Sequence, residues 1–172
     1  DLITFNAAIS ACAKAAQWMK AMEVLEKSMQ FTLEHDIITY SAVITACEKA
    51  AHWQLSLYFL HELHRSRVEA NTISYNATIS ACERGQQWEL ALDILENMEE
   101  ASSKPDIVSF NAAMNACEKA EQWQVALEVF RSISASPSEI TYNILINAFH
   151  QASKWMGALE VLEEMKGQNL VP

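Results

Sequence analysis

Apolar residues recur along the chain with the spacing of amphipathic helices. Tyr75, Ile79 and Cys82 lie at i, i+4 and i+7, which places them on one face of a helix. After a short polar interval, a second apolar stripe runs through Trp88, Ala91, Leu92, Leu95 and Met98. No stretch alternates as a strand does. The pattern predicts two helices separated by a break near residues 85–87.

This pair of helices recurs along the whole chain. Two landmarks recur with successive gaps of 35, 35, 35 and 32 residues: an aromatic residue in the first helix and a tryptophan that opens the second. The aromatic residues are Phe5, Tyr40, Tyr75, Phe110 and Tyr142, and the tryptophans are Trp18, Trp53, Trp88, Trp123 and Trp155. A shared fixed period predicts an array of supersecondary units. We place the units at residues 2–36, 37–71, 72–106, 107–138 and 139–172.

Each unit is too small to bury its own apolar face, so stacked units must share one continuous core. We therefore expect the tryptophans to pack in the core. The chain begins at Asp1, where the last residue of a preceding unit would fall, and ends at Pro172, one residue short of a full unit. We expect a segment of a longer array. The fourth unit is three residues short, and the deletion falls in the connector before Ser138, which leaves both helices whole.

The spacing of the glycines and histidines argues against an enzyme. Gly85, Gly157 and Gly167 are too dispersed to form a phosphate-binding loop, and the histidines of the segment 61–64 are not four residues apart as in the zinc-protease pattern. No apolar run reaches the length of about 18 residues that a membrane span requires. We expect no catalytic site, metal, cofactor, small-molecule substrate or membrane span.

The four cysteines occupy the same place in four consecutive units, and Phe149 holds that place in the fifth. They are Cys12, Cys47, Cys82 and Cys117. Packed helices lie about 8–10 Å apart, whereas a disulfide needs Cα atoms within about 7 Å. We expect buried free thiols rather than disulfides or zinc ligands.

The first helix of each unit also has a polar stripe. In the central unit it consists of Asn76, Ser80 and Arg84, at i, i+4 and i+8. The equivalent residues are Asn6, Ser10, Lys14, Ser41, Thr45, Lys49, Asn111, Asn115, Lys119, Asn143, Asn147 and Gln151. Stacking would align a ladder of amides and hydroxyls beside a row of cations. This chemistry suits single-stranded nucleic acid, and an ordinary solvated helix face is the alternative. The residues just before the first helices are N-cap types, which capping alone explains: Asp36, Asn71, Asp106 and Ser138.

The unit resembles a pentatricopeptide repeat, a helical hairpin of about 35 residues. The segment Ile73-Ser74-Tyr75-Asn76, the basic Arg84 and the ending Pro105-Asp106 carry the resemblance. All five units match. The tryptophan after the turn is unusual for the family, and only the third and fourth connectors and Pro172 keep the proline at its place.

The resemblance implies a right-handed all-α solenoid of about five helix-turn-helix repeats that binds single-stranded RNA at one base per repeat. The fifth and last residues of a repeat read the base, and the basic residue contacts phosphate. The phosphate-contacting residues would be Lys14, Lys49, Arg84 and Lys119. A branched aliphatic at the second place sandwiches the base, and these residues are Ile3, Ile38, Ile73, Val108 and Ile140.

By the same resemblance, each pair of residues implies a base. Asn6 with Asp36 resembles a uracil reader, Ser41 with Asn71 an adenine reader, Asn76 with Asp106 a second uracil reader, and Asn111 with Ser138 a cytosine reader. Asn143 has no last-place residue to pair with in this sequence, and the resemblance implies that it favours a pyrimidine. The expected target is 5′-UAUC followed by a pyrimidine. The resemblance further implies a role in organellar RNA processing, stability or translation in a mitochondrion or plastid.

The net charge of −10 opposes this interpretation, because RNA-binding domains are usually basic. We expect most acids to lie on the outer face, on the second helices: Glu89, Asp93, Glu96, Glu99, Glu160, Glu163 and Glu164. Glu48, Glu83 and Glu118 precede the cations, but adjacent helical residues point about 100° apart, so they need not face the ligand. The alternative function is a protein-binding scaffold for subunits of a larger complex, such as an organellar one.

Overall fold

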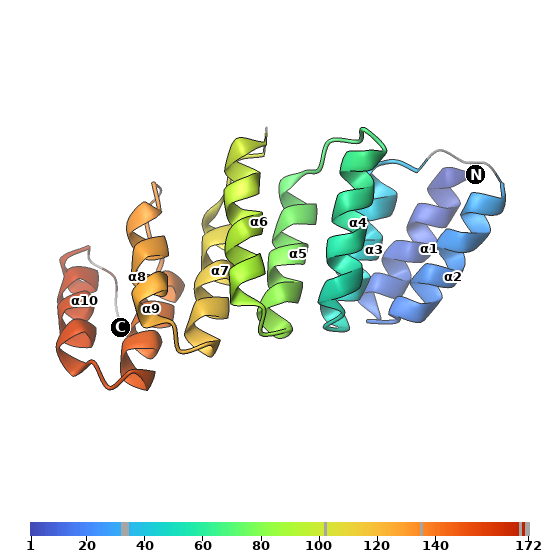
Figure 1. Cartoon of the computed structure of the whole chain (residues 1–172). Helices are drawn as coiled ribbons and strands as arrows, with labels where there is room; N and C mark the ends of the chain where they lie inside the picture. Colours follow the sequence, from blue (N-terminus) through green and yellow to red (C-terminus); the bar gives the residue numbers. More distant parts are fainter. Residues whose placement is uncertain (32–34, 102, 135, 169, 171–172) are drawn as a thin grey trace.

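The computed structural model describes all residues except 32–34, 102, 135, 169 and 171–172, and the side chains of residues 99 and 100. The described residues form ten helices and no strand (Figure 1). The first helices of the repeats are α1 (Leu2–Lys14), α3 (Ile37–Lys49), α5 (Thr72–Arg84), α7 (Ile107–Lys119) and α9 (Glu139–Gln151). The second helices are α2 (Trp18–Gln30), α4 (Trp53–Arg65), α6 (Trp88–Glu100), α8 (Trp123–Ser132) and α10 (Trp155–Gly167). The predicted all-α repeat array is confirmed.

A polar side chain caps the N-terminus of every first helix by accepting a backbone N–H three residues ahead. The caps are Asp1, Asp36, Asn71, Asp106 and Ser138. Such caps satisfy donors that the helix leaves free. The second helices have no side-chain cap and start directly from a tight turn.

The turn within each repeat places a non-glycine residue in the left-handed region. In the third repeat this is Gln86 (φ 57°). The backbone N–H of Gln87 donates to the Cys82 carbonyl (2.9 Å), and the N–H of Gln86 donates to the Glu83 carbonyl (3.2 Å). These two bonds make a Schellman motif. Gly85 precedes this position and has an ordinary φ of −82°.

The helices form two layers. Each first helix packs against the first helix of the next repeat, whereas no two second helices contact each other within the described part of the chain. Each second helix packs instead against its own first helix and against the first helix of the following repeat (Figure 1). Because the first helices are closer together, the array curves toward them, and they line its inner face.

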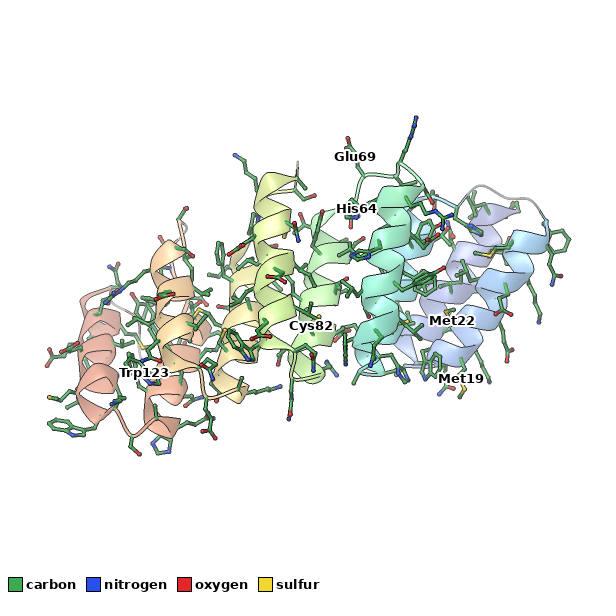
Figure 2. All side chains as sticks on the ribbon, in the orientation of Figure 1. Met19, Met22, His64, Glu69, Cys82 and Trp123 are labelled. Carbon is green, nitrogen blue, oxygen red and sulfur yellow. The ribbon has the colours of Figure 1, made fainter. Side chains whose placement is uncertain are left out.

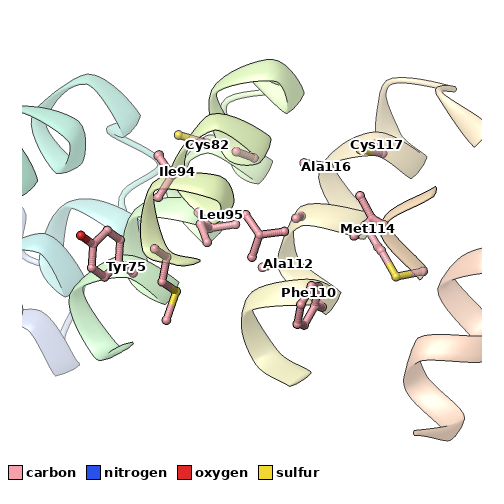
Figure 3. Close-up of a cluster of buried hydrophobic side chains, with 14 of the residues drawn as sticks. Tyr75, Cys82, Ile94, Leu95, Phe110, Ala112, Met114, Ala116 and Cys117 are labelled. Atoms are coloured by element: carbon pink, nitrogen blue, oxygen red, sulfur yellow. The ribbon is translucent and has the colours of Figure 1, made fainter. Parts of the chain in front are cut away.

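The core runs continuously between the two layers. Tyr75, Ile79 and Met98 are almost fully buried, and neighbouring core side chains of repeats three and four are shown in Figure 3. Cys47, Cys82 and Cys117 are fully buried free thiols, as predicted, and burial raises their pKa to about 11. Cys12 is free but only half-buried. None of the helices in the described residues has the length and apolar character that a bilayer span requires.

Four tryptophans are half-buried and pack against the core, as predicted, whereas Trp155 is 67% exposed. The structure adds contacts at the seams between repeats. These contacts lie at the end of the next repeat's first helix or in the turn that follows it. Trp18 packs on His52 with ring centroids 4.2 Å apart, and Trp123, labelled in Figure 2, lies 5.5 Å from Phe149. The tryptophan thus joins neighbouring repeats as well as opening its own helix.

Gly85→Ala is expected to destabilise the array by about 1–3 kcal/mol, the usual cost of overpacking. A Cβ at Gly85 would lie 2.2 Å from Cδ1 of Trp53, so the seam between repeats two and three must shift. Urea denaturation followed by circular dichroism measures the change. Gly167→Ala is the control, because nothing lies within 4 Å of its added Cβ. A Gly85→Ala variant as stable as this control would contradict the role of the seam.

Ser56→Ala is expected to stabilise the protein by about 1 kcal/mol. The Ser56 hydroxyl is fully buried and has no hydrogen-bond partner among the described residues, and an unsatisfied buried polar group costs about 1–3 kcal/mol. Alanine holds the equivalent place in the other repeats: Ala21, Ala91, Ala126 and Ala158. Thermal denaturation should show a higher melting temperature. A lower one would mean that the hydroxyl has a stabilising partner.

Candidate nucleic-acid interface

A branched aliphatic side chain is exposed at the start of every first helix. The exposed fractions are 78% for Ile3, 58% for Ile38, 62% for Ile73, 53% for Val108 and 64% for Ile140. Single exposed apolar residues are ordinary, but a regular row along one face indicates a surface that contacts a ligand. These are the residues predicted to sandwich bases.

Beside this row, the fifth and last residues of the first and third repeats are hydrogen-bonded to each other. Nδ2 of Asn6 donates to Oδ1 of Asp36, and Nδ2 of Asn76 donates to Oδ1 of Asp106, both at 3.1 Å. The repeat array therefore joins residues 30 positions apart into one polar unit. In each pair one N–H of the asparagine has no protein partner among the described residues.

A hydroxyl from the next repeat completes each of these pairs. Thr39 Oγ1 donates to Oδ1 of Asn6 at 2.6 Å, and Ser109 Oγ donates to Oδ1 of Asn76 at 2.5 Å. The same two hydroxyls also contact Oδ1 of Asp36 and Asp106 at 2.9 and 3.0 Å. The orientation of each asparagine amide is thus set by two side chains, a carboxylate and a hydroxyl.

Asp36 and Asp106 combine two functions, since each caps a helix and orients an asparagine. Burial alone would raise the pKa of these carboxyls, but hydrogen bonds from Thr39 and Asn6, and from Ser109 and Asn76, outweigh it and lower the pKa. Because the pKa is lower in the folded state, the ionised carboxyls stabilise the fold. This contribution is complete above the ordinary pKa of 3.8 and is lost as pH falls through the lower folded-state pKa. Both carboxylates are therefore charged at neutral pH.

The second repeat uses smaller side chains and leaves a pocket. Ser41 Oγ lies 3.5 Å from Oδ1 of Asn71 and 2.8 Å from Oγ of Ser74. A pocket of about 300 Å³ opens here between the exposed Ile38 and Ile73. Two cations of the inner face also line it, and they are Lys14 and Lys49.

Within the described residues, the fourth repeat lacks the hydrogen-bonded pair. Oδ1 of Asn111 is buried and has no hydrogen-bond partner there. Ser138 bonds instead to Thr141, with the two hydroxyl oxygens 3.0 Å apart. A serine side chain is shorter than an aspartate, and this repeat's connector is three residues shorter than the others. Asn143 is exposed on α9, and the position that would pair with it lies outside the described residues.

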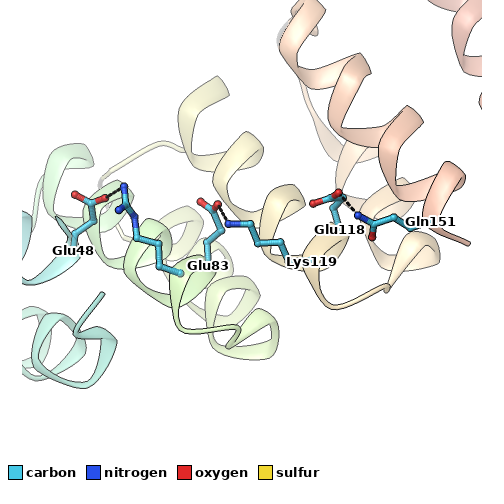
Figure 4. Close-up of polar contacts among 6 residues, drawn as sticks. Glu48, Glu83, Glu118, Lys119 and Gln151 are labelled. Atoms are coloured by element: carbon cyan, nitrogen blue, oxygen red, sulfur yellow. Dashed lines mark hydrogen bonds and ion pairs between the residues drawn. The ribbon is translucent and has the colours of Figure 1, made fainter. Parts of the chain in front are cut away.

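The predicted phosphate-contacting cations are of two kinds. Arg84 Nη2 lies 2.9 Å from Oε1 of Glu48, and Lys119 Nζ lies 2.8 Å from Oε1 of Glu83, so both cations are ion-paired with the preceding repeat (Figure 4). Lys14 and Lys49 are exposed and form no ion pair within the described residues.

Sequence reasoning missed both the hydroxyl at the third place and the ion pairs between repeats. The third-place residues are Thr4, Thr39, Ser74, Ser109 and Thr141, and their common hydroxyl was a usable signal. The glutamates were noted as neighbours of the cations in their own repeats. Their partners lie 36 residues further along the chain, which only stacking reveals.

The acids expected on the outer face are exposed on α6 and α10, apart from Glu99, whose side chain lies outside the described residues. Among the described residues, no group of three or more histidines, cysteines, aspartates or glutamates could hold a metal ion. The inner face therefore concentrates amides, hydroxyls, cations and aliphatic side chains, while excess acid faces outward.

Family models match nearly the whole chain. The model described as "Pentatricopeptide repeat domain" matches residues 1–50 and 58–120, and two models described as "PPR repeat" match residues 108–136 and 133–166. The chain belongs to the pentatricopeptide repeat family. No curated protein sequence matches it significantly.

Solved pentatricopeptide repeat structures share the fold. The pentatricopeptide repeat protein PPR10 from maize matches over 100% of this chain with 23% identity and a TM-score of 0.77, and the chain spans 25% of PPR10. The pentatricopeptide domain of Arabidopsis thaliana protein-only RNase P 1, solved in complex with tRNA, matches over 95% of this chain and 88% of that domain, with 13% identity and a TM-score of 0.83. PPR10 in complex with an 18-nt psaJ RNA element matches over 98% of this chain and 35% of that one, with 16% identity and a TM-score of 0.60.

Proposed function

We propose that this repeat array binds single-stranded RNA, one base per repeat, and prefers 5′-UAUC followed by a pyrimidine. The observation that carries the proposal is the row of exposed branched aliphatics beside hydrogen-bonded polar pairs on the inner face. An aliphatic side chain can cover the face of a base while the polar pair meets its edge.

The hydrogen-bond state of two pairs supports the proposed base. In the uracil-reading pairs, Asn6 and Asn76 each keep one free N–H, which can donate to a uracil carbonyl. A base with an amino group in that position would place one hydrogen-bond donor against another. Both donors would then be unpaired, which weakens binding of that base.

The adenine assignment of the second repeat also has matching features. Oδ1 of Asn71 already accepts from Ser74, so its N–H groups can donate to adenine ring nitrogens, and the 300 Å³ pocket beside Ser41 has room for a purine. The cytosine assignment of Asn111 with Ser138 rests on the family resemblance, because Oδ1 of Asn111 is buried.

Two of the similar structures support RNA as the ligand class, since one holds an RNA element and the other a tRNA. In this proposal the array recognises an organellar transcript in a mitochondrion or plastid and acts in its processing, stability or translation. The repeats supply recognition and no catalytic group.

Fluorescence anisotropy tests the proposal. A labelled single-stranded RNA containing UAUCU is compared with a scrambled RNA of the same composition at low and moderate salt. Tighter binding of the matched RNA is expected, because each mismatched base costs about 1–3 kcal/mol by analogy with DNA readout. Equal binding of both RNAs would overturn base reading. Binding of neither RNA would favour the protein-binding scaffold, and protein partners would then be sought.

A further inference from the structure

The ion pairs between repeats form a regular series on the inner face. Glu48 pairs with Arg84, and Glu83 pairs with Lys119 (Figure 4). The next glutamate in the series, Glu118, accepts a hydrogen bond from the neutral Gln151. Every one of these contacts joins the twelfth place of one repeat to the thirteenth place of the next.

The series is interrupted at the first repeat. Ala13 stands at the twelfth place there, so Lys49 has no carboxylate to pair with. Ala13 and Lys49 line the same pocket, so by analogy with Glu48 and Arg84 we infer that a glutamate at position 13 would pair with Lys49. Among the described residues, Lys49 of the second repeat is therefore not ion-paired, whereas Arg84 and Lys119 of the third and fourth repeats are.

The paired carboxylates lie beneath their cations. The side chains of Glu48 and Glu83 are 13% and 17% exposed, whereas those of Arg84 and Lys119 are 49% and 46% exposed. A phosphate can approach these cations from solvent, but it must compete with a carboxylate already in contact. Partly exposed ion pairs are weak, so the competition lowers affinity rather than abolishing it.

We propose that Glu48 and Glu83 limit the affinity of the inner face for RNA by holding Arg84 and Lys119 in these ion pairs. Lys49, which forms no ion pair within the described residues, supplies the main phosphate contact. This inference rests on the RNA-binding function proposed above. It assigns an affinity-setting role to glutamates that do not themselves contact the ligand.

The test compares the wild type with the double variant Glu48→Gln/Glu83→Gln by fluorescence anisotropy. The matched UAUCU RNA and the scrambled RNA are each titrated at several salt concentrations. The double variant is expected to bind both RNAs about 2- to 30-fold more tightly, the range that follows from releasing two surface ion pairs. Each released cation should also steepen the log–log salt dependence by about 0.7.

Glu96→Gln/Glu128→Gln is the matched control. It makes the same change in net charge on the exposed faces of the second helices α6 and α8. If this control gains as much affinity as Glu48→Gln/Glu83→Gln, net charge explains the gain and the inference is overturned. Unchanged affinity and salt dependence in Glu48→Gln/Glu83→Gln overturn it as well.

Ala13→Glu provides the reciprocal test. It restores the missing member of the series, and pairing with Lys49 is expected to weaken binding of both RNAs by about 2- to 5-fold. Melting curves check that this variant folds, and a misfolded Ala13→Glu leaves the decision with the double variant and its control.

The proposal of base reading and this inference fail separately. If the wild type does not distinguish the two RNAs but the double variant binds both more tightly than its control, base reading fails and the inference stands. Absence of RNA binding in every variant overturns both.

Discussion

Replacing Tyr75 by alanine is expected to lower the free energy of unfolding by about 3–5 kcal/mol, the cost usual for truncating a buried aromatic side chain. Tyr75 is 2% exposed and lies in α5 at the centre of the array (Figure 3). Its hydroxyl is 3.1 Å from Nε2 of His64, on the second helix of the preceding repeat. The cavity would therefore weaken both the third repeat and its contact with the second.

Urea denaturation measures this loss, and Tyr75→Phe is the matched control. Phenylalanine holds the equivalent place at Phe5 and Phe110, so the ring fits this position in the repeat. Removing only the hydroxyl is expected to cost about 1 kcal/mol, the net value of one hydrogen bond. Equal losses in Tyr75→Phe and Tyr75→Ala would mean that the hydrogen bond, rather than ring packing, holds the seam. A repeat array need not unfold in a single step, so the unfolding curve of Tyr75→Ala should also be examined for a second transition.

Asn76→Ala is expected to weaken binding of the matched UAUCU RNA by about 1–3 kcal/mol, the scale known for loss of a good base contact. Asn76 keeps a free N–H in the pair with Asp106, and alanine removes it. Binding of the scrambled RNA should change little, because phosphate and aliphatic contacts remain. Anisotropy titrations of both RNAs measure the difference.

The fold should tolerate the Asn76 substitution. Ser109 Oγ still has Oδ1 of Asp106 as an acceptor at 3.0 Å, and the cap of α7 does not involve Asn76. Asn97→Ala is the control, since Asn97 is exposed on the outer helix α6. Equal losses of affinity for the matched and scrambled RNAs would remove Asn76 from base reading, whatever its effect on stability.

The helices and their repetition could be predicted from the sequence, because both follow from local periodicity. The i, i+4, i+7 spacing of Tyr75, Ile79 and Cys82 predicted a helix with one buried face, and the structure contains it. N-cap residues such as Asp106 mark the helix starts, since capping depends only on residues within one turn. The buried free thiols of Cys47, Cys82 and Cys117 followed from their equivalent places in stacked repeats.

The pairing of the polar side chains could not be predicted from the sequence, because the partners lie 30 to 36 residues apart and meet only when the repeats stack. Stacking brings the Asn76 amide to Asp106 and Ser109, and it turns Glu48 toward Arg84. It also brings Trp18, Trp53 and Trp123, which pack against the core as predicted, into contact with the following repeat. A side chain at the end of a helix is buried or exposed according to the neighbouring repeat. The spacing of residues within one repeat specifies which side chains share a helix face. The contacts that those side chains make depend on how the repeats stack.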